Sequence, residues 1–162
     1  MKNRYYSLPN APEEISVQNV ICRLIASIGF RYYWATEDLS EKWLPFRPSV
    51  DSRSIDELLD HIWDLLNWTY SSVDSKSFEK PQSSDQLREA TLELIESLEM
   101  KFASLESEEL ASIILLKPPF WSVINGPLAD VLTHIGQIAT VRRIAGDPVK
   151  ESNPFSGTPP VL

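Results

Sequence analysis

Apolar side chains recur three or four positions apart in the first part of the chain, the spacing that places them on one face of a helix. The pattern predicts a first helix that starts near Pro12 and ends within residues 34–38. Glu13 and Glu14 would lie in its first turn, where the helix dipole favours acidic groups. The apolar positions are Ile15, Val17, Val20, Ile21, Leu24, Ile25 and Ile28.

A second helix is predicted to start at Ser54, because Ser54 and Glu57 form the pattern of a capping box. The positions that follow the 3.6-residue period are Ile55, Leu58, Leu59, Ile62, Leu65, Leu66 and Thr69. The preceding residues 40–53 contain Pro45 and Pro48 and read as a connecting loop. This loop is apolar enough, at Trp43, Leu44 and Phe46, to pack on the helices.

The serine-rich residues 71–84 predict a surface loop, after which a third helix starts near Ser83 or Ser84. Its periodic positions are Leu87, Ala90, Thr91, Leu94, Ile95, Leu98 and Phe102. Residues 105–116 fit either a short further helix or an extended segment.

The fourth helix is predicted to begin between Ser122 and Pro127 and to end at Gly146. One side of it would carry Leu128, Val131, Leu132, Ile135, Ile138, Ala139 and Arg142. Arg142 and Arg143 fall in the last turns, where basic groups complement the helix dipole.

The prolines divide the chain at intervals that suit four helices. They leave four stretches free of proline, 13–44, 49–80, 82–117 and 128–147. A chain of 162 residues suits one domain with a substantial core. We therefore predict an all-α four-helix bundle, a single domain over residues 1–162 with irregular ends at about 1–12 and 149–162.

The formal net charge of -8 limits the classes of binding partner that we expect. An acidic surface repels phosphate backbones and anionic lipid, so neither nucleic acid nor a membrane is expected as a partner. The single Cys22 cannot form an intramolecular disulfide, and no signal peptide or apolar stretch of about 18 residues is present. These features predict a cytoplasmic location.

The candidate chemistry lies in the two histidines of the chain, His61 and His134. Asp130 precedes His134 by four residues and so shares its helix face. Both histidines fall at the border of an apolar stripe, a position that suits a cleft between helices. Two imidazoles and one carboxylate can hold a divalent metal with coordination positions left open. Alternatively, each is an ordinary polar residue at a helix flank.

Other groups could support such a site, but the sequence does not choose among them. Glu57, Asp64 and Gln137 have the right helical phase to orient an imidazole. The chain has no glycine-rich phosphate loop, no Gly-x-Ser-x-Gly and no Cys-x-x-Cys. The catalytic residues, including any general acid or base, are therefore unknown from the sequence.

Two segments resemble the DinB-like (YfiT-like) superfamily. The segment from Gly126 to Pro148 is similar to the family's fourth helix, and the segment from Ser54 to Leu66 is similar to its second. The resemblance implies a bacterial four-helix bundle with up-down-down-up connectivity. It also implies a metal held by one histidine of the second helix and a His-x-x-x-His pair on the last.

Within this resemblance, His61 matches the first ligand and His134, followed by Ile-Gly-Gln, matches the second histidine of the pair. Asp130 stands where the family more often has histidine, which gives two histidines and one aspartate. Zn, Ni or Fe are the metals expected for these donors.

The family includes proteins assigned as metal-dependent hydrolases and as transferases that use low-molecular-weight thiols. The resemblance therefore implies a divalent-metal-dependent enzyme, hydrolase-like or thiol S-transferase-like, with a small-molecule substrate such as a thiol. The alternative is a non-catalytic bundle that binds a ligand or a partner protein and has lost or altered the metal site. A homodimer formed through exposed helix faces is compatible with either.

Overall fold

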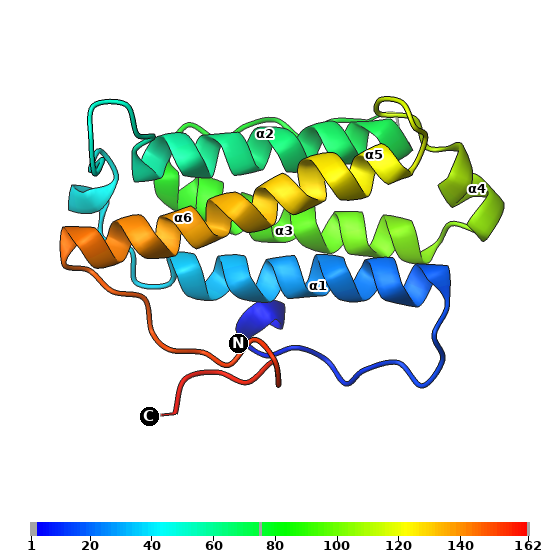
Figure 1. The fold of residues 1–162 in the computed structure, drawn as a ribbon, viewed down its shortest axis with the longest axis horizontal. Helices are drawn as coiled ribbons and strands as arrows, with labels where there is room; N and C mark the ends of the chain where they lie inside the picture. Colours follow the sequence, from blue (N-terminus) through cyan, green and yellow to red (C-terminus); the bar gives the residue numbers. More distant parts are fainter. Residues whose placement is uncertain (1–2, 75, 162) are drawn as a thin grey trace.

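Four long helices dominate the computed structural model, which describes residues 3–74 and 76–161 (Figure 1). They are α1 (Val17–Thr36), α2 (Ile55–Asp74), α3 (Ser84–Ala103) and α6 (Ala129–Ala145). Within the described ranges the helices are accompanied by a single isolated β-bridge, between Asn153 and Thr158. The predicted all-helical bundle is confirmed.

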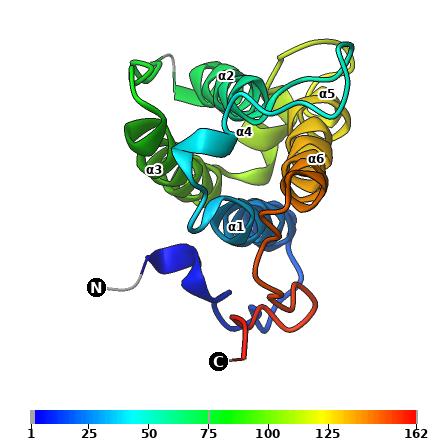
Figure 2. The same ribbon diagram turned by 90° about the vertical axis from the view of Figure 1, so that its left-hand side faces the viewer.

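The four long helices lie at the corners of the bundle when it is viewed along its length (Figure 2). α1 and α6 run in one direction, and α2 and α3 run in the other (Figure 1). α1 packs against α3 and α6, and α2 packs against the same two helices. The contact between α2 and α6 brings together the two histidine-bearing segments.

The starts of the first two helices follow their capping residues. α1 begins at Val17 and not near Pro12, because Ser16 is its N-cap and the Ser16 Oγ accepts the N–H of Asn19 at 3.1 Å. At α2, the N–H of Ser54 donates to Glu57 Oε2 at 2.8 Å, which is one half of the predicted capping box. The Ser54 hydroxyl donates to Asp56 instead.

The middle of the chain is more helical than predicted. α2 continues to Asp74, so the loop before α3 is shorter than the predicted 71–84. α3 starts as predicted, with Ser83 Oγ accepting the N–H of Gln86 at 3.4 Å. Of the two alternatives for residues 105–116, the structure has the short helix, α4 (Ser107–Ser112). Its N-terminus carries a capping box between Glu106 and Glu109.

The last helix starts one residue earlier than predicted, with α5 (Trp121–Val123), and continues through a π-helical turn, η3 (Ile124–Leu128). Gly126 leaves helical geometry there, with φ -92° and ψ -107°. Pro127 has no N–H to donate, which favours a kink at this point. The kink sets the direction in which α6 starts and hence where Asp130, in its first turn, lies.

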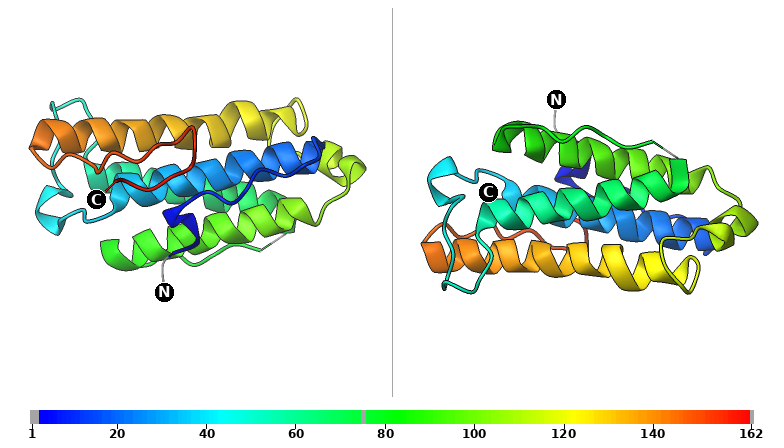
Figure 3. Two further views of the ribbon diagram at one scale, coloured as in Figure 1. Left: turned by 90° about the horizontal axis from the view of Figure 1, so that it is seen from below. Right: turned by 90° about the horizontal axis from the view of Figure 1, so that it is seen from above.

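The ends and the 40–53 loop pack on the helices. Trp43, which ends the 3-10 turn η2 (Glu41–Trp43), packs against the core with Leu44 and Phe46, as predicted. The 3-10 turn η1 (Arg4–Tyr6) places Tyr5 against Gly29, where a Cβ would come within 2.5 Å of the ring. Both ends of the chain run along the bundle near α1 (Figure 3).

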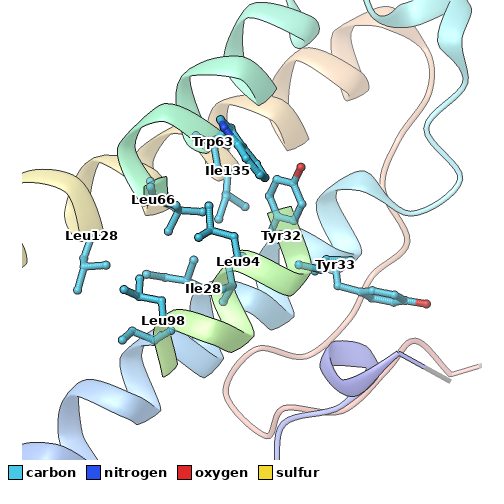
Figure 4. Packing of buried hydrophobic residues seen from close by; sticks show 14 of the residues in the cluster. Ile28, Tyr32, Tyr33, Trp63, Leu66, Leu94, Leu98, Leu128 and Ile135 are labelled. Carbon is cyan, nitrogen blue, oxygen red and sulfur yellow. The ribbon is translucent and has the colours of Figure 1, made fainter. Parts of the chain in front are cut away.

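The core fills the space between the four long helices (Figure 4). Side chains from all four point into it, and their burial is the main contribution to stability. Fully buried examples are Ile28, Tyr32, Leu66, Leu94, Leu98 and Leu128. Among the described residues, no helix is long and apolar enough to cross a membrane.

Arg142 lies in the last turn of α6 and on its apolar side, as predicted, and it is buried there. Its side chain is 2% exposed, and Nη1 donates to the carbonyl oxygens of Ala35 at 2.8 Å and Glu37 at 3.0 Å. Nη2 lies 2.8 Å from Asp147 Oδ2. These carbonyls end α1 and have no partner within the helix, so Arg142 ties the end of α1 to the end of α6.

Candidate metal centre

The packing of α2 against α6 brings His61, Asp130 and His134 together. One ligand atom from each lies within 4.8 Å of the others. His61 comes from the second turn of α2, and the other two come from consecutive turns of α6. The prediction that these three groups meet is confirmed, and together they could hold a metal ion.

The distances from Asp130 to the two histidines are close to those expected around a shared ion. Asp130 Oδ2 is 3.6 Å from His61 Nε2, and Asp130 Oδ1 is 3.4 Å from His134 Nε2. Two ligands bound to one ion at about 2.0–2.2 Å are themselves about 3.0–3.5 Å apart. The imidazole rings lie edge to face with centroids 4.7 Å apart. Small side-chain adjustments would therefore bring all three donors around one centre.

Gln137 orients the imidazole of His134. Its Oε1 lies 2.7 Å from His134 Nδ1, one turn further along α6. An amide oxygen only accepts, so Nδ1 donates its proton to Gln137 and the lone pair is left on Nε2. Metal-binding histidines in proteins are held by the same kind of contact.

The other two candidates for this supporting role are engaged elsewhere, which corrects the prediction for them. Glu57 lies 3.0 Å from Arg47 Nη2 and accepts the N–H of Ser54. Asp64 lies 3.1 Å from Lys80 Nζ on the outside of α2. Helical phase could not separate these residues from Gln137, because it does not report which neighbour packs against each face.

The burial of the three residues differs. The side chains of His61 and Asp130 are 32% and 45% exposed, whereas that of His134 is 9% exposed. The predicted border position is therefore wrong for His134, which other parts of the chain cover. The candidate site therefore has one buried residue and two residues that reach solvent, so a small molecule can approach it.

Arg53 also lies at this site, and no pattern in the sequence indicates it. It lies in the loop before α2, and its Nη1 is 3.2 Å from His134 Nε2. No spacing rule links it to His134, because the two residues are far apart in the chain and only the docking of the loop brings them together.

The protonation of His61 follows from these neighbours. Burial is the largest cause that lowers the pKa of His61 below its usual value, and the charges of Arg53 and His134 lower it further. The carboxylate of Asp130 acts in the opposite direction. The net effect favours the neutral imidazole, which is the form that binds a metal.

A cavity of about 480 Å³ opens beside His134. Its walls include Leu58 and Val141 on the apolar side and Arg53 and Gln137 on the polar side. Cavities of this size and mixed lining hold small molecules. A larger cavity of about 560 Å³ lies between α1, α6 and the C-terminal segment, but the three candidate ligands do not line it.

Comparison of the chain with models of known families, with curated proteins and with solved structures finds no match.

Proposed function

We propose that this protein is a divalent-metal-dependent enzyme of the DinB-like type, with His61, Asp130 and His134 as the metal ligands. The convergence of these three side chains from α2 and α6 is the observation that carries the proposal. Two imidazole nitrogens and a carboxylate oxygen are donors that suit Zn, Ni or Fe(II).

The family assignment is supported by the arrangement of the helices. α1 and α6 run opposite to α2 and α3, which agrees with the connectivity that the resemblance implies (Figure 1). One candidate ligand comes from the second long helix, and two, four residues apart, come from the last. Aspartate in place of a histidine at position 130 leaves this spacing unchanged.

The surrounding residues support binding of a small molecule next to the metal. Three protein ligands leave coordination positions free, and the ion would supply Lewis acidity toward water or a thiol. Gln137 holds the ring of His134, and the adjacent cavity gives a substrate room beside Arg53. A hydrolase-like or low-molecular-weight-thiol transferase-like reaction fits this arrangement, and a requirement for an added thiol distinguishes the two.

A non-catalytic bundle that binds a ligand or a partner is the second candidate. The observation that favours it is the guanidinium of Arg53, a cation 3.2 Å from the nitrogen that a metal would need. In this case the cavity beside His134 would bind a ligand without a metal.

Metal analysis of purified protein tests the first candidate. The protein should carry no histidine tag, because a tag would bind the same ions. We expect close to one divalent ion per chain in the wild type, and its loss in His134→Ala. Asp64→Asn removes a carboxylate from the outer face of α2 and should keep the metal. Metal-free wild type after exposure to Zn, Ni and Fe(II), or metal retained by His134→Ala, contradicts the proposal.

A further inference from the structure

Arg53 differs from Arg47, the other arginine of the loop before α2, in the side chain that its guanidinium contacts. Its guanidinium lies 3.2 Å from an imidazole nitrogen, whereas Arg47 in the same loop lies 3.0 Å from the carboxylate of Glu57. Among the described residues, no carboxylate lies within ion-pair distance of Arg53. In a chain with a net charge of -8, an arginine that faces a histidine instead of an acid needs an explanation.

The contact uses the one lone pair that a metal also needs. Gln137 Oε1 accepts the proton on His134 Nδ1, so Nε2 has a single lone pair to offer. Arg53 Nη1 donates to that lone pair. One sp² lone pair cannot accept this hydrogen bond and bind a metal ion at the same time, so the two states exclude each other.

Arg53 has room to leave. It is exposed and stands at the end of a loop, and the cavity of about 480 Å³ that it lines lies directly beside it. Two carboxylates lie in the same neighbourhood: Asp51 also lines this cavity, and Asp130 faces the histidines. A guanidinium that stays close to a divalent cation is repelled by it, unless an anion lies between them.

We infer that Arg53 gates the metal centre: its guanidinium and a metal ion compete for His134 Nε2, and the displaced guanidinium binds an anionic group of the substrate beside the metal. This inference rests on the proposed function and adds a substrate class to it, small molecules with a carboxylate or an equivalent anionic group. It also requires that anion and metal strengthen each other's binding, because coupling between two ligands is reciprocal.

Calorimetric titration with Ni(II) of the untagged protein tests the competition. Arg53→Gln should bind Ni(II) about tenfold more tightly than the wild type, because a competing cation close to the site has been removed. Arg143→Gln is the matched control: it removes the same charge from an exposed position on α6 that lines the other cavity. Its affinity should stay within about twofold of the wild type, since solvent screens the more distant charge.

A second titration, in which acetate replaces chloride at constant ionic strength, tests the anion. Acetate should raise the Ni(II) affinity of the wild type and of Arg143→Gln, and should have little effect on Arg53→Gln. An acetate effect of equal size in all three proteins overturns the assignment of Arg53 to an anionic group.

The outcomes separate this inference from the proposed function. Equal Ni(II) affinities in wild type and Arg53→Gln overturn the competition and leave the metal site standing. Ni(II) binding by Arg53→Gln, without binding by the wild type or Arg143→Gln, supports the competition and shows that the native site is closed to metal. Absence of binding in all three proteins overturns both.

Discussion

Two polar clusters lie on α6, centred on residues eight positions apart, and they use their hydrogen-bonding groups differently. Arg142 is 2% exposed and meets Ala35, Glu37 and Asp147, so its donors are matched by acceptors of the chain itself. His134 is comparably buried, but its Nε2 faces a cation at 3.2 Å and a carboxylate oxygen at 3.4 Å. Two groups of opposite charge therefore lie close to the same nitrogen of His134, whereas the donors of Arg142 each have acceptor oxygens.

The difference separates a structural polar group from a candidate functional one. A buried charge with matched partners links two helix ends and specifies how they dock. A cluster of two imidazoles, a carboxylate and a guanidinium gains less from its own contacts and retains the capacity to bind something else. Functional sites commonly carry such a cost in stability. Four experiments test whether the two clusters differ in this way.

The largest effect is expected at the structural cluster. Arg142→Met should lower the free energy of unfolding by about 3 kcal/mol, because it leaves Asp147 and two helix-end carbonyls without their partner. Urea unfolding measures the change. Arg143→Met, the same substitution at the next and exposed position, should change it by less than about 0.5 kcal/mol. Similar losses in the two variants would mean that the Arg142 contacts do not stabilise the fold.

The next largest effect is expected from metal binding, which should stabilise the folded protein. At about 100 times its Kd, a metal that binds only the folded protein should raise the free energy of unfolding by about 2.7 kcal/mol. A chelator should reverse the gain, and His134→Ala should show none. Thermal unfolding with and without Zn or Ni provides the measurement. A gain that persists in His134→Ala would place the metal elsewhere on the chain.

A smaller effect is expected at Gln137, whose Oε1 lies 2.7 Å from His134 Nδ1. Gln137→Leu should weaken metal binding by about 10- to 100-fold, since the ring loses the acceptor that orients it. Gln137→Glu keeps an acceptor and should preserve the affinity, as should Thr140→Val, whose hydroxyl only bonds to Gly136 of its own helix. Calorimetry distinguishes these outcomes, and unchanged affinity in Gln137→Leu would remove this residue from the site.

The smallest effect concerns the site without metal. In the presence of a chelator, His134→Leu should change the free energy of unfolding by less than about 1 kcal/mol. Gln137 and Arg53 lose their contact with the imidazole, but both are exposed and water can solvate them. Comparison with Arg142→Met by urea unfolding tests the contrast directly. A loss as large as that of Arg142→Met would make His134 a structural residue like Arg142.

Local patterns account for what could be predicted. The four helices follow from apolar periodicity, and the start of α3 follows from a local signal, the Ser83 cap. The predicted start of α1 near Pro12 is wrong, because acidic residues such as Glu13 and Glu14 only favour a first turn, whereas the cap at Ser16 sets the boundary. Asp130 and His134 could be paired because four residues make one helical turn.

Apolar periodicity and spacing in the sequence are enough to show that this chain forms amphipathic helices and that Asp130 and His134 share a helix face, because both features depend on contacts within a few turns of one helix. That His61 of α2 meets these two residues depends on the packing of α2 against α6. The folded structure shows in addition that His134 is buried, that Arg53 faces it, that Gln137 and not Glu57 or Asp64 orients it, and that Arg142 reaches the end of α1. These features depend on how α2, α6 and the loop before α2 dock, and docking is fixed by the packing of the whole core.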